Sequence, residues 1–309
     1  KNSNAFSPLR TNRYHLLLPK KIMDLFLSIL SSSFIFVLFR SFPRWKVDTL
    51  QAVIANYFVA FACGIFLFHE NIPSSATLNA GIPFALLCGI LFISLFIIMG
   101  ISAQKNGVST TSIAVKMSMA LSVILVLIMN HTPLGWGNII PLVIAVVGVF
   151  LVSFAKQSNP QSKGFLWMLL VLFFGSAGLD LVLYFTNSEW LPNGFHDGIF
   201  AALGFLMAGL MGLAYFIIKL LTGTISFDRR SWFGGIILGI PNYFSIYLLV
   251  KSYNTLELDP HQILSIANVG VVLITSILGL SLFKEKFTVQ KTIGLILCLA
   301  ALGFSIGFG

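Results

Sequence analysis

The chain has 309 residues, of which 57% are hydrophobic and only 9% are charged. A soluble domain carries about 25% charged residues, so this composition excludes a water-soluble globular protein and indicates a polytopic membrane protein. The formal net charge is +9. The basic residues stand in short loops between apolar segments, as in membrane topology signals, so we expect the lipid bilayer as a partner and no nucleic acid.

Ten apolar segments follow one another along the chain, and about 20 residues suffice for a helix to cross a bilayer. Asn106-Gly107 predicts a tight turn between two of them, and Pro260 suits the first position of a helix. Gly235 and Gly239, four residues apart, predict a close helix contact. We expect an all-α polytopic membrane protein with transmembrane helices at 22–39, 50–68, 80–102, 108–129, 135–154, 164–186, 198–220, 232–251, 260–282 and 288–307.

The ten helices divide into two sets of five that share a faint internal similarity, between residues 103–124 and 251–272. A second copy of a five-helix unit starts from the opposite face of the membrane, so we expect two inverted five-helix repeats. Such repeats commonly place a binding site near the bilayer midplane. The expected organisation is a disordered basic N-terminal tail at 1–22, a first repeat at 23–155, a linker at 156–163 and a second repeat at 164–309.

Basic residues gather in alternate loops. The loops after the second, fourth, sixth and eighth segments hold only Lys251, whereas the other loops hold twelve basic residues: Arg40, Arg44, Lys46, Lys105, Lys156, Lys163, Lys219, Arg229, Arg230, Lys284, Lys286 and Lys291. This bias predicts a multi-pass protein of a cell membrane of the bacterial inner-membrane type, with odd-numbered loops in the cytoplasm. The basic tail at 1–22 carries the opposite bias.

One lysine stands deep inside a transmembrane segment. Lys116 lies about 12 Å below the start of its helix at Val108, close to mid-membrane. A charge at that depth costs about 2.5–3.5 kcal/mol on the insertion scale. Ser109, Ser112 and Ser118 give the helix a small polar face around it, which we expect to line a polar cavity. The alternative is a lysine that pairs structurally or snorkels to the interface.

A second charge, Asp180, lies in the sixth segment, roughly 9 Å from its end. Its expected depth differs from that of Lys116 by about 12 Å, so direct contact requires helix tilt or a bridging water or substrate. We expect a role in gating protons or substrate, with a plain structural role as the alternative.

Further polar residues stand in the apolar segments. Pro241 interrupts a helix ladder beside Asn242 and Tyr243, near mid-membrane. Each of these polar residues alone also fits hydrogen bonding between helices. The predicted substrate-binding set is Lys116, Asp180, Asn242, Tyr243, Asn268, Ser112, Asn56 and Tyr57.

The end of the chain carries a short motif. Residues 283–297, FKEKFTVQKTIGLIL, place acidic Glu285 before a polar turn, with Gln290 and Gly294 at the start of the last helix. With the ten segments and the repeat, this pattern resembles the drug/metabolite transporter superfamily of the EamA type, over essentially everything after residue 22. The first repeat departs from it, with HTPLGW at 131–136 where the acidic turn would stand. The resemblance implies a secondary transporter of small metabolites that does not hydrolyse nucleotides.

We therefore expect an ion-coupled or facilitative transporter of a small polar or zwitterionic metabolite such as an amino acid, with protons as a candidate coupling ion and alternating access around a midplane cavity. The sequence has no phosphate loop, zinc pair, nucleophile elbow or CxxC, so we expect no enzyme activity, cofactor or metal. Two alternatives stay open: an intramembrane enzyme using Asp180 and His261 on a lipid-linked substrate, and a non-transporting receptor or assembly factor.

Overall fold

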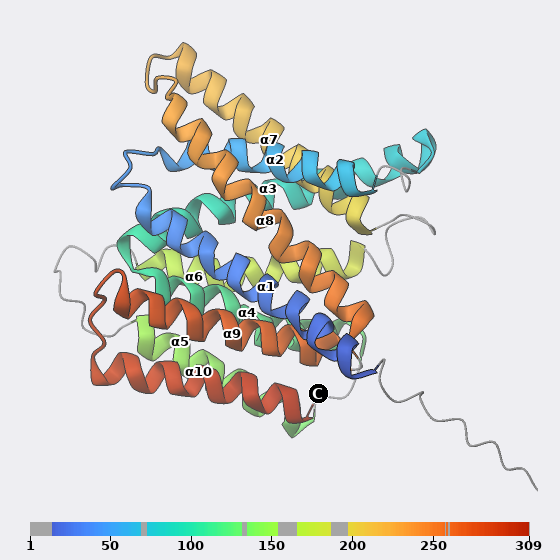
Figure 1. Ribbon diagram of the computed structural model, residues 1–309, viewed down its shortest axis with the longest axis vertical. Coiled ribbons are helices and arrows are strands. Elements are labelled where there is room, and N and C mark those ends of the chain that lie inside the picture. Colours follow the sequence, from blue (N-terminus) through green and yellow to red (C-terminus); the bar gives the residue numbers. More distant parts are fainter. Residues whose placement is uncertain are drawn as a thin grey trace, which may run out of the picture.

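The computed structural model describes residues 14–68, 73–131, 135–153, 166–186, 197–256, 258 and 260–308. Helices account for most of this part of the chain, and it contains no strand (Figure 1). The helices are α1 Tyr14–Ser41, α2 Thr49–Phe68, α3 Ser75–Lys105, α4 Val108–Met129, α5 Trp136–Ser153, α6 Leu166–Phe185, α7 Asp197–Leu221, α8 Arg229–Thr255, α9 Pro260–Ser281 and α10 Val289–Phe308.

Each helix coincides with one expected apolar segment, and the larger differences lie at the start of α3 and of α1. α3 begins at Ser75 because Ser74 caps it, accepting the backbone N–H of Thr77. α1 begins at Tyr14, so the expectation of a disordered tail is wrong for residues 14–22. This stretch continues α1 although it contains Pro19, which helix propensity disfavours. Residues 1–13 and the linker at 156–163 lie outside the described residues.

Two expected boundaries are confirmed. α3 ends at Lys105 and α4 begins at Val108, after a turn at Asn106 and Gly107. Gly107 has a φ of 98°, a conformation that glycine adopts without the strain other residues incur. Pro260 is the first residue of α9, where its missing N–H leaves no helical hydrogen bond unmade.

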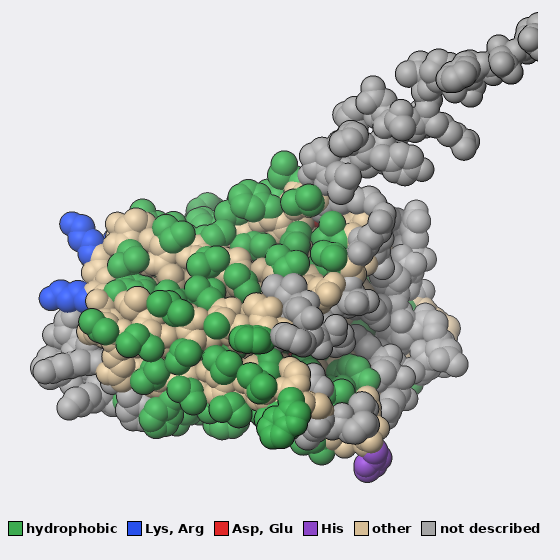
Figure 2. Space-filling model, turned by 90° about the horizontal axis from the view of Figure 1, so that it is seen from below, with side chains coloured by type: hydrophobic (Ala, Val, Ile, Leu, Met, Phe, Trp, Pro, Cys, Tyr) green, Lys and Arg blue, Asp and Glu red, His purple; other side chains and the backbone are tan. Residues whose placement is uncertain are grey.

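The outer surface of the bundle is apolar. Large side chains such as Phe174 and Ile277 are 61% and 60% exposed, as is expected only against lipid. Figure 2 shows apolar side chains across one flank of the molecule, with basic side chains gathered at one end. Among the described residues, eight helices (α1–α4 and α6–α9) are long and apolar enough to cross a bilayer, and α5 and α10 are apolar over shorter stretches. The protein is therefore a multi-pass membrane protein.

Eight helices pack in a closed ring, in the order α2, α8, α1, α9, α4, α6, α3, α7 and back to α2. α5 and α10 pack on each other outside this ring, beside α4 and α9, at the bottom of Figure 1. Gly235 and Gly239 of α8 lie against the α2 backbone at Ala52 and Asn56, the close contact that their spacing predicts. Because helices from the two halves of the chain alternate one by one around the ring, its interior is lined by both halves.

The loops alternate between the two ends of the bundle. The turn before α4 meets the loop after α9, where the backbone N–H of Val108 donates to Glu285. The loop after α1 meets the first turn of α8, where the backbone N–H of Asp48 donates to the hydroxyl of Ser231. We call this the odd-loop end; it lies at the left of Figure 1, and the even-loop end lies opposite.

Candidate functional site

A cavity of about 280 Å³ lies inside the ring. Residues of seven ring helices line it, with contributions from both halves of the chain: α1, α2, α3, α4, α6, α7 and α8. Most of the lining side chains are apolar. The polar ones are Ser32, Tyr57, Lys116, Ser176, Asp180, Asn242 and Ser245. Four of the eight predicted binding residues, Lys116, Asp180, Asn242 and Tyr57, therefore meet at one cavity.

Lys116 reaches the cavity from the middle of α4. On the same helix Ile113, Ala114 and Met117 are buried against other helices, whereas Lys116 and Val115 are half-buried and line the cavity. The lysine is therefore directed to the interior of the ring. Within the described part of the chain, its ammonium group has no hydrogen-bond or ion-pair partner.

Asp180 reaches the same cavity from the last third of α6. The hydroxyl of Ser122 on α4 donates to Asp180 Oδ2 at 3.3 Å, and the same hydroxyl donates to the carbonyl of Met119 at 3.0 Å. Lys116 and Asp180 attract each other electrostatically, but the structure records no ion pair between them among the described residues. Two opposite charges thus line the same cavity without a direct contact.

α8 contributes Asn242 and Ser245 to the cavity. Pro241, inside α8, has no N–H, so the carbonyl of Ile237 loses its partner in the helix ladder. The hydroxyl of Ser245 donates to the carbonyl of Asn242 at 2.8 Å, and the carbonyl of Ser245 accepts the hydroxyl of Ser28 on α1 at 2.6 Å. The second bond holds the part of α8 after Pro241 against α1, beside the cavity.

Ser112 and Asn268, two further predicted binding residues, are not among those lining the cavity. The hydroxyls of Ser112 and Thr275 lie 2.6 Å apart, and the Asn268 amide donates to the sulfur of Met119 at 3.1 Å. Both contacts join α4 to α9. The predicted polar face of α4 is thus divided between the cavity and a helix interface, a distinction that residue spacing alone does not reveal.

Asn56 and Tyr243 complete the predicted set and lie where α2 meets α8. The Asn56 carbonyl is beside Gly239, and the Tyr243 ring is beside Gly64. In the described structure the Asn56 amide atoms and the Tyr243 hydroxyl are buried without a hydrogen-bond partner. They lie outside the set that lines the cavity, so the structure places them in a helix interface.

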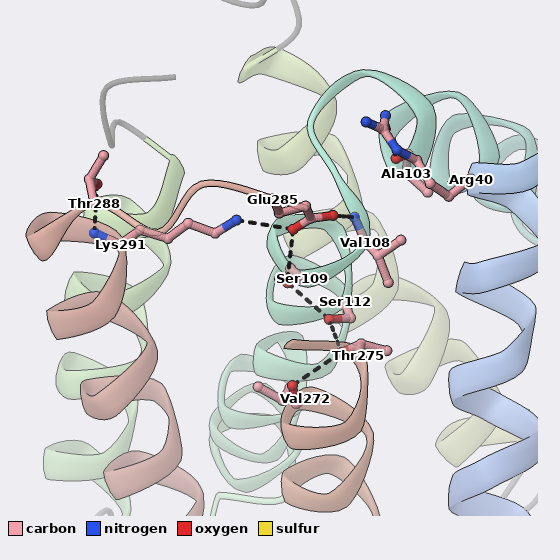
Figure 3. Close-up of polar contacts among 10 residues, drawn as sticks. All are labelled: Arg40, Ala103, Val108, Ser109, Ser112, Val272, Thr275, Glu285, Thr288 and Lys291. Atoms are coloured by element: carbon pink, nitrogen blue, oxygen red, sulfur yellow. Dashed lines mark hydrogen bonds and ion pairs between the residues drawn. The ribbon is translucent and has the colours of Figure 1, made fainter. Parts of the chain in front are cut away.

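A second polar cluster, around Glu285, lies at the odd-loop end (Figure 3). Glu285 Oε1 accepts the backbone N–H of Val108 at 2.6 Å, and Oε2 accepts the hydroxyl of Ser109 at 2.7 Å. Lys291 Nζ lies 3.2 Å from Oε2. The carboxylate therefore caps α4, whose N-cap residue, Gly107, has no side chain for this role. The positive end of the helix dipole adds to its stabilisation.

Sequence reasoning reached Glu285 only as part of the family resemblance and missed its contact with α4. The available signal was Gly107, because a helix that starts after glycine needs its cap from elsewhere. Lys291 was grouped with loop residues by the charge bias. Its side chain is 9% exposed and its ammonium group also lies 4.4 Å from the centre of the Phe287 ring.

Further hydrogen bonds cross between ring helices at the odd-loop end. Arg40 of α1 donates to the carbonyl of Gln104 at the end of α3, and the Gln104 amide donates to Thr49 of α2 at 2.8 Å. The hydroxyls of Ser102 and Thr111, 2.9 Å apart, join α3 to α4. Together with Glu285, these contacts link α1, α2, α3, α4 and the loop before α10.

At the even-loop end, polar contacts join adjacent ring helices in pairs. Asn130 of α4 donates to the hydroxyl of Tyr184 on α6 at 2.9 Å. Lys251 of α8 pairs with Asp24 of α1 at 3.1 Å. These contacts hold α4 to α6 and α8 to α1, two pairs on opposite sides of the cavity.

The described residues contain no group of three or more histidine, cysteine or acidic side chains that could hold a metal ion. Cys63, Cys88 and Cys298 are free thiols. The side chain of His261, part of the enzyme alternative, lies outside the described side chains. What the cavity offers is one cation, one carboxylate and an amide in an apolar enclosure, which suits the binding of a small molecule.

No family model matches the chain. A protein of Haemophilus influenzae that is described as uncharacterized is 26% identical over 288 residues, covering 90% of this chain and 96% of the relative. The two chains thus share nearly their whole length, and the relative supplies no activity, substrate or partner.

Proposed function

We propose that the protein is a secondary transporter of a small zwitterionic metabolite, such as an amino acid, of the drug/metabolite transporter type that the sequence resembles. The observation that carries the proposal is Lys116, a half-buried ammonium group without a partner among the described residues, at a cavity built by both halves of the chain. A lysine at this depth makes membrane insertion of the helix less favourable. Binding of a negatively charged ligand explains why a lysine stands there.

The order of helices in the ring supports an inverted repeat. The inverted repeat pairs α1 with α6, α2 with α7, α3 with α8, and α4 with α9. When the members of each pair are exchanged, the ring order is the same but runs in the opposite direction. The α5–α10 pair maps onto itself as well. This is the relation expected from a two-fold axis in the membrane plane, and it favours ten transmembrane helices whose two halves rock about a central site.

The two ends suggest how access alternates. In this conformation the contacts of Glu285 and Arg40 tie the odd-loop end, while the cavity reaches Asp180 in the part of α6 near the even-loop end. We infer that solute enters from the even-loop end and leaves after the odd-loop contacts break. By the positive-inside rule the odd-loop end is cytoplasmic, in a cell membrane.

The test is uptake of radiolabelled L-phenylalanine, L-alanine, L-glutamate and L-lysine into liposomes containing the purified protein, with and without a proton gradient. The proposal expects uptake of at least one above empty liposomes, and its loss in Lys116→Met. The matched control is Lys219→Met, which removes a lysine from the last turn of α7, away from the cavity.

Uptake that survives Lys116→Met unchanged would contradict the site. Binding of a panel member without uptake would favour a receptor, and release of a covalent product without a gradient would favour an intramembrane enzyme. A stimulation of uptake by the proton gradient would identify protons as the coupling ion.

A further inference from the structure

Four aromatic rings form a continuous wall on the cavity, which we call the aromatic wall: Tyr57 of α2, Phe92 and Phe96 of α3, and Phe205 of α7. The centre of the Tyr57 ring lies 6.4 Å from that of Phe92, 5.6 Å from Phe96 and 5.9 Å from Phe205. Phe92 and Phe205 are 5.4 Å apart. These spacings lie within the range of favourable ring contacts, so a further ring could extend the cluster.

The polar end of Tyr57 is not offered to a ligand. Its hydroxyl donates to the carbonyl of Phe92 at 2.7 Å. Tyr57 and Phe205 are almost fully buried, whereas Phe92 and Phe96 are half-buried and retain surface towards the cavity. This part of the cavity therefore meets a ligand with apolar surface, and burying a polar group against it costs free energy.

The charged groups of the cavity favour charge on the other part of a ligand. The cavity holds one lysine and one aspartate, with no ion pair between them among the described residues. A simple anion pairs with Lys116 and leaves Asp180 without a positive counter-charge, and a simple cation pairs with Asp180 and leaves Lys116 without a negative one. A buried charge without a partner is costly, so a ligand that carries both charges is preferred to either.

The size of the cavity limits the body of the ligand. Its volume of about 280 Å³ lies just below the usual range of small-molecule pockets, about 300–1,000 Å³. A single ring with a short charged end suits that space.

We propose that the cavity selects an amphipathic zwitterion with an aromatic or comparably large apolar body, such as an aromatic amino acid. The carboxylate is held by Lys116, the ammonium group by Asp180 with Asn242 alongside, and the apolar body by the aromatic wall. This inference rests on the proposed function and narrows it from small zwitterions in general to those with a ring-sized side chain.

The test is a competition experiment on the protein in lipid nanodiscs, with radiolabelled L-phenylalanine as the probe. Unlabelled L-phenylalanine, L-alanine, 3-phenylpropionate and phenethylamine are the competitors. Unlabelled L-phenylalanine is identical to the probe, and L-alanine carries both charges without the ring. 3-Phenylpropionate carries the ring and the carboxylate, and phenethylamine carries the ring and the amine. The expected result is that L-phenylalanine competes at least about tenfold more strongly than each of the others.

Two variants separate the aromatic wall from the charges. Phe96→Leu is expected to weaken the binding of L-phenylalanine about tenfold and to leave the binding of L-alanine unchanged. The matched control, Phe174→Leu, alters a ring that is 61% exposed on the outside of α6 and is expected to change neither. In Lys116→Met, L-phenylalanine is expected to compete no more strongly than phenethylamine, because the partner of its carboxylate is gone.

The failures of the two proposals are distinguishable. Uptake of L-alanine or L-glutamate in preference to L-phenylalanine contradicts the aromatic selectivity but still supports the proposed transport function. Equal weakening of both amino acids by Phe96→Leu also overturns it, because the ring would then act on the fold. If none of the four labelled amino acids is bound or taken up, both proposals are contradicted.

Discussion

Two lysines lie inside the bundle, and their surroundings differ. Lys291 is 3.2 Å from the Glu285 carboxylate, beside the Phe287 ring, in a cluster that caps α4. Lys116 lies near the middle of α4 and faces a cavity, without a hydrogen-bond or ion-pair partner in the described structure. A buried charge whose bonds are made within the protein stabilises a conformation, whereas one whose bonds are left open is available to a ligand. The comparison predicts that the first lysine acts on stability and the second on transport.

The largest effect is expected from Glu285→Ala. It leaves Lys291 buried without its partner and removes the cap of α4, so unfolding should become easier by about 3–5 kcal/mol. Thermal unfolding in detergent, followed by tryptophan fluorescence, measures this. Lys286→Met, one residue away and exposed, is the control and should leave the unfolding temperature unchanged. Equal unfolding temperatures for Glu285→Ala and the wild type would show that the Glu285 cluster is not stabilising.

Lys116→Met tests the other side of the comparison. If the ammonium group binds the carboxylate of a solute, its loss removes a charge-assisted hydrogen bond of about 1.5–3 kcal/mol, so uptake should fall by about tenfold or more. The unfolding temperature should stay the same or rise, because a charge without a partner has been replaced by an apolar side chain. A large decrease in the unfolding temperature would instead identify Lys116 as structural.

Gly107→Ala sharpens the account of the Glu285 cluster. The residue has a φ of 98°, and an added Cβ would lie 2.7 Å from Glu285 Oε1. The backbone strain alone costs about 1–3 kcal/mol, because residues other than glycine rarely adopt this region. Gly135→Ala is the matched control, since an added Cβ there meets nothing within 4 Å. Should both variants unfold at the same temperature, the tight contact between Gly107 and Glu285 does not constrain the fold.

The smallest effect concerns Asp228, at the odd-loop end outside the membrane span. The hydrogen bond from the Ser231 hydroxyl lowers the pKa of this carboxyl, with further contributions from the backbone N–H groups of Arg230 and Ser231. A lowered folded-state pKa gives stability that is present above the unfolded-state pKa of about 4 and is lost as the pH falls through the folded-state value. Asp228→Ala should therefore slightly lower the unfolding temperature at pH 7, and this difference should disappear at a pH well below 4. A difference that is equal at both pH values would contradict this account of the cap.

Much of the fold could be predicted from hydropathy because a bilayer fixes the length and apolar character of each span. The positions of all ten helices and the turn at Gly107 follow from local composition. The start of α1 did not, because residues 14–22 are outside the apolar run and contain Pro19, so neither hydropathy nor propensity predicts helix there. The order of helices in the ring depends on contacts between distant segments, which the internal similarity indicated only faintly.

The site could be predicted in part. Lys116 and Asp180 stand out because charges are rare in transmembrane segments, and both reach the cavity. Asn268 and Ser112 carry the same local signal but lie in the interface between α9 and α4, because a helix rotation of about 100° per residue decides between cavity and interface. Of the aromatic wall only Tyr57 was predicted; its three phenylalanines gave no signal, since phenylalanines in an apolar segment are indistinguishable from lipid-facing ones.

The central claim is that Lys116 faces an aqueous cavity inside the ring and not lipid. The direct measurement is the reaction rate of Lys116→Cys with a charged, membrane-impermeant thiol reagent, in a protein whose three natural cysteines are replaced by alanine. The control is Ile240→Cys, which replaces a side chain that is 48% exposed on the outside of α8 beside Pro241. The account predicts fast modification at position 116, slowed by L-phenylalanine, and none at position 240. Modification at 240 but not at 116 would place the lysine away from water and contradict the account.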